Sequence, residues 1–475
     1  MNQRYHQILN KGIISLLGMG LCLSQLTIVH AEQRSIETDE TYPGAFSLAC
    51  PFFTVFDDIS SLDFFRLWND GDGSQIGIEK VFLEDDTLAA LSTKFGPPKG
   101  YAISVWNREL VENPLGEKFD GSCLIVPTEE LKPNWKRISI DGSSAPWDND
   151  YNPKADLLSV YSSVPTENFD RTVTTRLLLT GTTALSRTVT YKMKMNGVLY
   201  PAEKIKGVFE DADLRHISNE SSFWSLCPEP QLKVTGMQFC TPASYFALFE
   251  DIGVNIVELT GNHLRDFDWP PLIETFQLLE AAEIGYYGAG RTIAEARQPY
   301  YVAHHGNQFV FLGCNIAGPE HVYVGDNLPG VNRCDFDQME QEIRSLSDDG
   351  KIVVVTLQYY ENYSHVPNDQ QLIDFQRLSD AGAIIVSGSQ AHMPQIMKPT
   401  ADRWIHYGLG NLFFDQMDRP VEGTREEFLD RFIFYQGKLI QVELITAILE
   451  DYSQPRLMTA DEREDFLTRM FSCIK

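Results

Sequence analysis

Short apolar runs rich in β-branched residues recur along this chain, and several of them end in a glycine beside polar side chains. In the clearest example, the run Val254–Leu259 is followed by Thr-Gly-Asn-His-Leu-Arg-Asp at Thr260–Asp266. Such a run is typical of a buried strand, and the glycine permits a sharp turn after it. An amide, an imidazole and a carboxylate therefore stand at the carboxyl end of a strand, where open α/β sheets bind their ligands.

Strand patterns alternate with helix patterns from about Arg171 onward, and this alternation predicts an α/β fold. The expected strands are Leu177–Thr180, Val254–Leu259, Phe309–Gly313, Ile352–Leu357, Ala383–Val386 and Trp404–Tyr407. The expected helices are Thr241–Asp251, one from Pro270 to before Gly285, Phe336–Leu346, Asn368–Ala381, and Thr459–Ile474 with Thr459 as its cap.

The chain has 475 residues, which exceeds what one ordinary core supports and predicts two domains. The smaller, N-terminal domain contains strand patterns at Tyr101–Trp106 and Ser122–Pro127 but no catalytic constellation. The expected segments are a signal peptide over 1–31, a linker over 32–44, an accessory α/β domain over 45–165, a main domain over 171–450 and a C-terminal helix or tail over 451–475.

The N-terminus has the pattern of a secretory signal. Arg4 and Lys11 precede the apolar stretch Ile13–Val29, and Val29-His30-Ala31 supplies small residues at the cleavage positions. The stretch is short and diluted for a membrane span. We therefore predict a secreted or periplasmic protein that acts on the extracellular face, and an uncleaved N-terminal membrane anchor is the alternative.

The net charge limits the classes of binding partner, and the cysteine content bears on disulfide formation after export. A net charge of −27 and a pI of about 4.7 argue against nucleic-acid binding, which needs a basic face. Export permits disulfides, and Cys227 with Cys240 and Cys314 with Cys334 are close enough in sequence to pair. An odd number of cysteines follows the signal peptide, so at least one is expected to be free or intermolecular.

Five of the expected strands and the segment Ala212–Ile217 end in segments of similar composition, and most of these six ends carry Asn, His, Gln or Glu near glycine. If all six ends lie on one rim, their side chains suit metal-assisted hydrolysis. Carboxylate, imidazole and amide groups bind divalent cations, and an imidazole also transfers protons. The six ends are Thr180–Arg187, Ser218–Glu220, Gly261–Asp266, Gln358–Glu361, Ser387–His392 and Gly408–Asp415.

The order of these motifs resembles the CapA family of poly-γ-glutamate capsule-biosynthesis proteins, which is related to the calcineurin-like metallophosphatases. The resemblance covers about Thr174–Leu444. It implies a metallophosphatase-like layered sandwich of β-sheets flanked by helices, with the smaller α/β domain added at the N-terminus. The segments that carry the resemblance are Ala212–Glu220, Val257–Asp266, Gly285–Gly290, Leu357–Gln371, Asp380–His392 and Tyr407–Asp415.

Several positions depart from the family pattern, where hydroxyl or amide groups replace ligand-type residues. These positions are Thr182, Ser218, Gln358 and Gln390. Amides and hydroxyls are weak ligands for transition metals, so a two-metal site is doubtful. The ligand-type residues that remain would suffice for one divalent cation of unspecified species or for a metal-free acid/base site.

The resemblance also implies roles for particular residues. The implied cation ligands are Glu220, Asn262 and His392. The implied catalytic residues are His263 as proton donor or orienting group, Asp266 as the group that holds its imidazole, and Glu361 as ligand or base. The implied substrate-binding residues are Gln358, Gln390 and Asn411.

Two functions stay open at this point. The first is an exported enzyme that acts on poly-γ-glutamate or another cell-envelope polymer, by metal-assisted hydrolysis or amide transfer. The second is a non-catalytic polymer-binding or assembly protein with a degenerate metal site. In both, the expected partner is an anionic polymer or a polysaccharide of the cell envelope, and the sequence makes no prediction of the oligomeric state.

Overall fold

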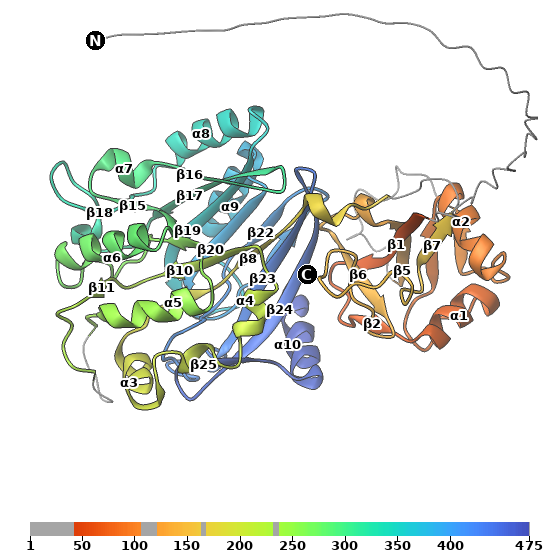
Figure 1. Ribbon diagram of the computed structural model, residues 1–475, viewed down its shortest axis with the longest axis horizontal. Helices are drawn as coiled ribbons and strands as arrows, with labels where there is room; N and C mark the ends of the chain where they lie inside the picture. The colour runs from red at the N-terminus through yellow and green to blue at the C-terminus, as the bar shows by residue number, and fades with distance from the viewer. Residues whose placement is uncertain (1–41, 106–120, 163–167, 231–236, 475) are drawn as a thin grey trace, which may run out of the picture. The chain divides into compact units, whose positions relative to one another are not determined.

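Three large β-sheets organise the residues described by the computed structural model, which are 42–105, 121–162, 168–230 and 237–474 (Figure 1). One sheet comes from the N-terminal part of the chain, and the other two come from the part that follows. The predicted signal peptide over 1–31 lies outside the described residues.

The N-terminal sheet has seven strands in the order β2-β6-β1-β5-β3-β4, with β7 pairing with β1. The helices α1 (Ser61–Asp70) and α2 (Asp85–Phe95) add Phe64, Trp68 and Leu91 to its core. Strand β1 begins at Tyr42, so the last residues of the expected linker lie in the sheet instead. The strands are β1 Tyr42–Pro51, β2 Asp58–Ile59, β3 Lys80–Leu83, β4 Ile103–Val105, β5 Ser122–Pro127, β6 Trp135–Ile140 and β7 Ser159–Ser162.

The second sheet has eight strands in the order β14-β13-β10-β8-β23-β24-β25, with β9 pairing with β10. The side chains of β8 are buried along its whole length, as expected for a strand covered on both faces. One face packs against α3 (Arg187–Asn196), α5 (Ala247–Asp251) and α6 (Pro270–Ala281). The strands are β8 Thr174–Leu179, β9 Thr182–Thr183, β10 Leu214–Asn219, β13 Ile256–Glu258, β14 Gly285–Tyr287, β23 Glu426–Tyr435, β24 Lys438–Glu450 and β25 Gln454–Leu457.

The third sheet has six strands in the order β16-β17-β19-β20-β22-β21. Helices α8 (Phe336–Asp348) and α9 (Asp369–Ala381) cover one face of it. Its other face shares a core with the second sheet, in which Val354 and Trp404 meet Leu177 and Phe432. The strands are β16 Tyr300–His304, β17 Asn307–Asn315, β19 Ile352–Asn362, β20 Ile385–Ala391, β21 Met397–Pro399 and β22 Trp404–His406.

These layers confirm the expected fold class, a mixed α/β arrangement of sheets flanked by helices. The helix expected at Thr241–Asp251 is shorter than predicted. Thr241 pairs with Phe223 in a two-residue parallel strand, a 3₁₀ turn follows at Ala243–Phe246, and only Ala247–Asp251 is α-helical. Strand pairing with a distant segment therefore overrides the local helix signal.

The C-terminal segment is part of the core of these layers. Helix α10 (Ala460–Ser472) begins at the predicted cap, Thr459, which forms a capping box with Glu462. Its side chains Phe466, Leu467 and Met470 are buried against the second and third sheets. Strand β25 pairs with β24 across residue 450, so the expected tail and the main domain share one sheet.

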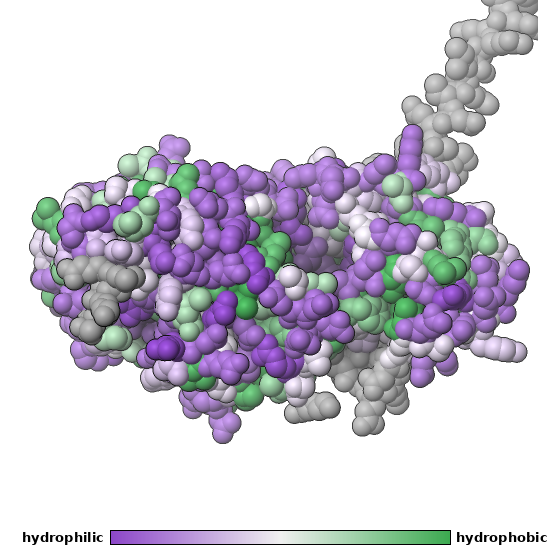
Figure 2. All heavy atoms as spheres, turned by 90° about the horizontal axis from the view of Figure 1, so that it is seen from below, coloured by the Kyte–Doolittle hydropathy of each residue, from purple (hydrophilic) through white to green (hydrophobic). Residues whose placement is uncertain are grey.

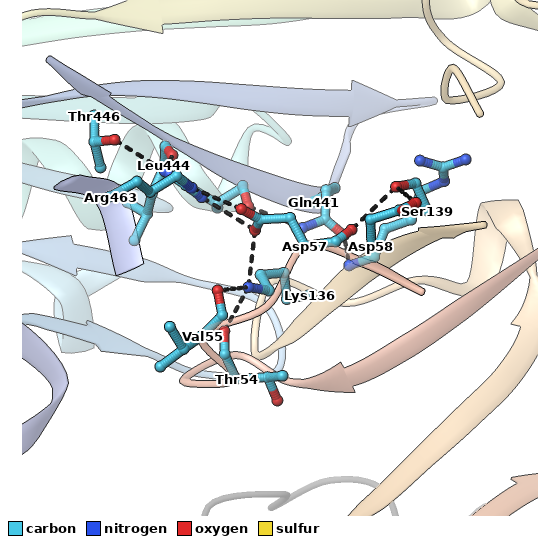
Figure 3. A network of polar contacts seen from close by, with 12 residues as sticks. Thr54, Val55, Asp57, Asp58, Lys136, Ser139, Gln441, Leu444, Thr446 and Arg463 are labelled. Carbon is cyan, nitrogen blue, oxygen red and sulfur yellow. Dashed lines mark hydrogen bonds and ion pairs between the residues drawn. The ribbon is translucent and has the colours of Figure 1, made fainter. Parts of the chain in front are cut away.

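A polar network joins the N-terminal sheet to α10 (Figure 3). The Asp57 carboxylate accepts hydrogen bonds from Arg463 Nε at 2.6 Å and from Lys136 Nζ at 2.9 Å. Burial raises the pKa of Asp57, but the hydrogen bonds and charges of Arg463 and Lys136 together lower it by more, so the pKa is about 2. Asp57 is therefore held as an anion between two cations.

Three disulfides between the described cysteines close loops or join strands. Cys227–Cys240 and Cys314–Cys334 confirm the predicted pairs. Cys50–Cys123 links the neighbouring strands β1 and β5 and was not predicted. Of the cysteines that the structure describes, Cys473 is free, as the odd count required.

The surface seen in Figure 2 is mostly hydrophilic, with apolar side chains scattered between charged and polar ones. Within the part of the chain that the structure describes, no helix has both the length and the apolar character needed to cross a membrane.

Candidate functional site

The six predicted strand ends are divided between two sheets. The Thr182, Glu220 and Asn262 segments belong to or follow strands of the second sheet. The Gln358 and Gln390 segments belong to strands of the third sheet, and the Gly408–Asp415 segment follows its strand β22. Side-chain contacts nevertheless connect the two groups, as described below. The predicted single rim is therefore the shared edge of a sheet sandwich.

Two glycines allow these strand ends to approach each other. A Cβ atom on Gly261 would lie 2.5 Å from the Cα of Glu220, and one on Gly181 would lie 2.2 Å from the carbonyl oxygen of Gly410. Real Cβ atoms do not approach that closely. The glycines that mark the strand ends in the sequence are thus required by the close backbone contacts at the site.

The structure brings Glu220, Asn262, Gln358 and Gln390 together. Gln358 Nε2 donates to Asn262 Oδ1 at 2.8 Å and to Gln390 Oε1, and lies 3.4 Å from Glu220 Oε1. The amide nitrogen of Gln358 therefore lies at the point on which the three oxygens converge. Glu220 Oε2 is buried and has no hydrogen-bond partner among the described residues.

Gln390 has a left-handed backbone, with φ of 73°. Such a conformation is uncommon outside glycine and is typical of functional sites. The backbone N–H of Gln390 donates to Thr182 Oγ1 at 3.2 Å. Thr182, the counterpart of the family's first aspartate, therefore holds the strained residue in place.

His392 and Asn411 form a second pair next to this cluster. His392 Nδ1 and Asn411 Oδ1 are 2.8 Å apart, and the Asn411 amide also donates to His392 O, Gln416 Oε1 and Thr424 O. Both residues are buried. Because the Asn411 side chain is fully engaged within the protein, it positions His392 and is not placed to bind substrate.

The structure brings His263 and Asp266, to which the resemblance assigns proton donation and orientation of the imidazole, into contact. His263 Nδ1 and Asp266 Oδ2 are 2.6 Å apart, and the side chains are 12% and 10% exposed. Burial lowers the pKa of His263, but the hydrogen bond to Asp266 and the charge of Glu220 raise it more, so the pKa lies above its ordinary value. The bond fixes the ring and leaves Nε2 as the nitrogen that can face a ligand.

Phe239 lies against this pair, and sequence reasoning missed it. Its ring stacks on the His263 ring with a centroid distance of 3.7 Å, and its backbone N–H donates to Asp266 Oδ2 at 2.6 Å. Cys240, the next residue, is disulfide-bonded to Cys227. The predicted disulfide was the available signal, since it anchors the loop that presents Phe239.

Glu361 is exposed, and its carboxylate accepts a hydrogen bond from Tyr363 Oη at 2.5 Å. Tyr363 also accepts from Gln416 Nε2, and its ring is 5.8 Å from that of His392. Glu361 therefore reaches the predicted site only through Tyr363, a residue that sequence reasoning missed.

The residues present do not fit a divalent metal ion. Among residues 42–105, 121–162, 168–230 and 237–474, no group of three or more His, Cys, Asp or Glu side chains could hold one. The oxygens that do converge meet the amide nitrogen of Gln358, a hydrogen-bond donor that cannot act as a ligand while it donates. The implied ligands Glu220 and Asn262 belong to this cluster, whereas His392 bonds to Asn411.

Comparison with known proteins matches this part of the chain to one family. The family model described as "Bacterial capsule synthesis protein PGA_cap" matches residues 176–416. That range includes every site residue predicted from the sequence.

Two curated relatives and one solved structure are similar to the chain. A capsule biosynthesis protein CapA from Bacillus anthracis is 26% identical over 171 residues, which cover 35% of this chain and 42% of that protein. A PGA biosynthesis protein CapA from Bacillus subtilis is 26% identical over 170 residues, which cover 36% and 45%. The chain thus matches less than half the length of these relatives. A 5'-nucleotidase precursor from Thermus thermophilus has a TM-score of 0.36 at 13% identity, covering 63% of this chain and 58% of its own.

Proposed function

The chain belongs to the bacterial capsule synthesis protein PGA_cap family, and from that premise we propose that it serves in the biosynthesis of an anionic cell-envelope polymer of the poly-γ-glutamate kind. It does so by binding the polymer, without a divalent cation, at the Gln358 cluster (Glu220, Asn262, Gln358 and Gln390) and the residues around it. Export through the predicted signal peptide is part of this proposal.

The position of the Gln358 amide nitrogen carries the proposal. It donates to Asn262 and Gln390 and faces Glu220, which are the oxygens that a cation would otherwise hold together. An amide that joins these oxygens by hydrogen bonds gives the site its shape without metal. The family scaffold is retained, and its centre is suited to recognition of polar groups.

The surrounding residues supply complementary groups for such a polymer. Glu220 Oε2, buried and unpaired among the described residues, can accept a hydrogen bond from a backbone amide of the polymer. His263, whose pKa is raised, offers a donor to a carboxylate. A γ-linked polyglutamate chain carries both groups in every repeat.

Binding of a γ-linked glutamate oligomer to the purified protein, measured by isothermal titration calorimetry, tests this proposal. We expect the same affinity with and without EDTA. Gln358→Leu should weaken binding by about tenfold or more, because a hydrogen-bonded cluster is lost. The matched control is Gln376→Leu on α9, where the amide nitrogen donates to Asp380 and the amide oxygen accepts from Lys398. Loss of binding on chelation, or no binding to the wild-type protein, would contradict the proposal.

Direct metal analysis provides a second test. We expect no stoichiometric Zn²⁺ or Mn²⁺ in the wild-type protein after equilibrium dialysis. The double variant Gln358→His/Gln390→His places two imidazoles beside Glu220, and we expect it to acquire affinity for Zn²⁺. Stoichiometric, tight metal in the wild-type protein would show that the cluster rearranges around a cation.

The His263–Asp266 pair favours a second candidate function, metal-free hydrolysis or amide transfer on the same polymer. A 2.6 Å contact that orients an imidazole is the arrangement of a general acid or base. Release of new amino groups from poly-γ-glutamate by the wild-type protein, but not by His263→Ala, would support this function. If neither protein releases product while both are folded, binding is the function that stands.

A further inference from the structure

Arg187 is a further residue beside the site with a left-handed backbone. It begins α3 with φ of 49°, a left-handed conformation that is uncommon for a residue with a long side chain. Its Nη2 forms an ion pair with Asp415, whose other oxygen accepts from the backbone N–H of Thr188 at 3.2 Å. The side chain is 16% exposed, so the guanidinium is largely but not fully covered.

Aromatic rings connect Arg187 to both histidines of the site. The central carbon of the guanidinium lies 4.3 Å from the centre of the Phe239 ring and 5.3 Å from that of Phe414. Phe239 stacks on His263, and the ring of Phe414 is 4.8 Å from that of His392. Arg187 is therefore a cation in an aromatic environment next to the proposed binding surface.

The hydrogen-bonding capacity of Arg187 is not used up. Its Nε is buried and has no hydrogen-bond partner in the part of the chain that the structure describes. A guanidinium has five N–H donors and no acceptor, and a buried donor without a partner is uncommon and calls for a physical reason. A carboxylate or phosphate oxyanion satisfies such a donor, because two of its oxygens match the fork of the guanidinium.

We propose that Arg187, with Phe239 beside it, is the residue that binds an oxyanion of the polymer, a carboxylate or a phosphate. This inference rests on the proposed function and names the chemistry that the site recognises. The ligand competes with Asp415 for the guanidinium. Removing the cation should therefore weaken binding, whereas neutralising its competitor should strengthen it.

Fluorescence anisotropy with a labelled γ-linked glutamate oligomer tests these opposite effects. We expect Arg187→Met to weaken binding by about tenfold or more, since charge-assisted hydrogen bonds are lost. Arg187→Lys keeps the charge but not the fork, and should lie between Arg187→Met and the wild type. Asp415→Asn still offers an oxygen to Thr188 and should bind more tightly than the wild type. Equal affinity for wild type and Arg187→Met, or weaker binding by Asp415→Asn in its folded state, would overturn the inference.

The matched control is Arg291→Met. Arg291 also pairs with a carboxylate, Glu280, and lies 5.0 Å from a ring, that of Phe276, but it is outside the site. We expect its replacement to leave the affinity unchanged. An equal loss in Arg291→Met and Arg187→Met would show that the effect is general electrostatics, and would overturn the inference.

Small oxyanions separate this inference from the proposed function. The Nε–H signal of Arg187 is followed by NMR in protein labelled with ¹⁵N-arginine, and is assigned by its absence from Arg187→Met. Saturable movement with glutarate supports a carboxylate ligand, and movement with inorganic phosphate alone supports a phosphate-bearing polymer. If either anion shifts the Arg187 signal but the glutamate oligomer does not bind, the oxyanion subsite is supported and the proposed function is contradicted. If the oligomer binds but neither anion shifts the Arg187 signal, the oxyanion subsite is contradicted and the proposed function stands.

Discussion

Two histidine–aspartate pairs in this molecule have almost the same geometry and very different surroundings. His263 and Asp266 are 2.6 Å apart on one loop, and their side chains are 12% and 10% exposed. His406 and Asp430 are 2.7 Å apart, and their side chains are 0% and 1% exposed. The second pair joins β22 of the third sheet to β23 of the second.

The difference lies in the other ring nitrogen. His406 Nε2 bonds the carbonyl oxygen of Gln395 at 3.0 Å, and Trp404 Nε1 donates to Asp430 at 3.0 Å. His263 instead has its ring stacked on Phe239, and under the proposed function its Nε2 faces the ligand. A close His–Asp contact is therefore not enough to indicate a functional site, because the buried pair has nearly the same distance and serves to connect two sheets.

The largest expected effect is on the buried pair. His406→Ala leaves the Asp430 carboxylate buried without its main partner, so we expect a loss of about 3–5 kcal/mol in the free energy of unfolding. Urea denaturation followed by circular dichroism measures it, with His321→Ala at an exposed position as the control. A loss below about 1 kcal/mol would mean that the two sheets do not depend on this contact.

A smaller loss of stability is expected when the loop beside His263 is opened. Cys227→Ser/Cys240→Ser removes a closure over 13 residues and should cost about 3 kcal/mol. Cys314→Ser/Cys334→Ser, with a separation of 20, should cost a similar amount. We expect only the first to weaken polymer binding as well, because it releases Phe239. Equal binding by both variants would show that the loop does not position the site.

His263→Ala should affect binding more than folding. The side chain contacts Phe239 and Asp266 near the surface, so we expect a loss of about 1 kcal/mol in stability. Affinity for the glutamate oligomer should fall by about tenfold or more. The comparison between the pairs would be reversed if His263→Ala unfolded the protein while His406→Ala only weakened binding.

The smallest expected effect is a pH dependence that belongs to the His263–Asp266 pair. Because the pKa of His263 is raised on folding, its contribution to stability is complete below the unfolded-state pKa of about 6.5. The contribution is lost as pH rises through the higher folded-state pKa. Urea midpoints between pH 5.5 and 8.5 should therefore converge for wild type and His263→Ala as pH rises. A difference that grows with pH would contradict this assignment.

Local patterns predicted the elements well where one segment determines them. The apolar run at Ile352, the caps at Asn368 and Thr459 and the proline at Pro270 mark elements that the structure contains. The distribution of strands between two sheets did not follow from these patterns, because an apolar run does not specify its neighbours. Cys50–Cys123 was missed for a similar reason, since its residues are 73 positions apart and meet only through strand pairing.

At the site, the sequence predicted the residue types but not their use. Glu220, Asn262, Gln358 and Gln390 do meet, since the strand ends that carry them share an edge. That the Gln358 amide nitrogen would lie among their oxygens depends on side-chain rotamers, which no spacing encodes. Arg187 and Phe239 come together through the packing of a helix start and a disulfide-closed loop.

The cluster of Glu220, Asn262, Gln358 and Gln390 has a consequence at the level of the gene. Glutamine and histidine codons differ only at the third base, so a single base change converts either Gln358 or Gln390 into histidine. A population of cells under selection for a metal-dependent activity could reach an imidazole-bearing version of the site without altering the scaffold. Directed evolution from this chain therefore has a short mutational path between two chemistries on one fold.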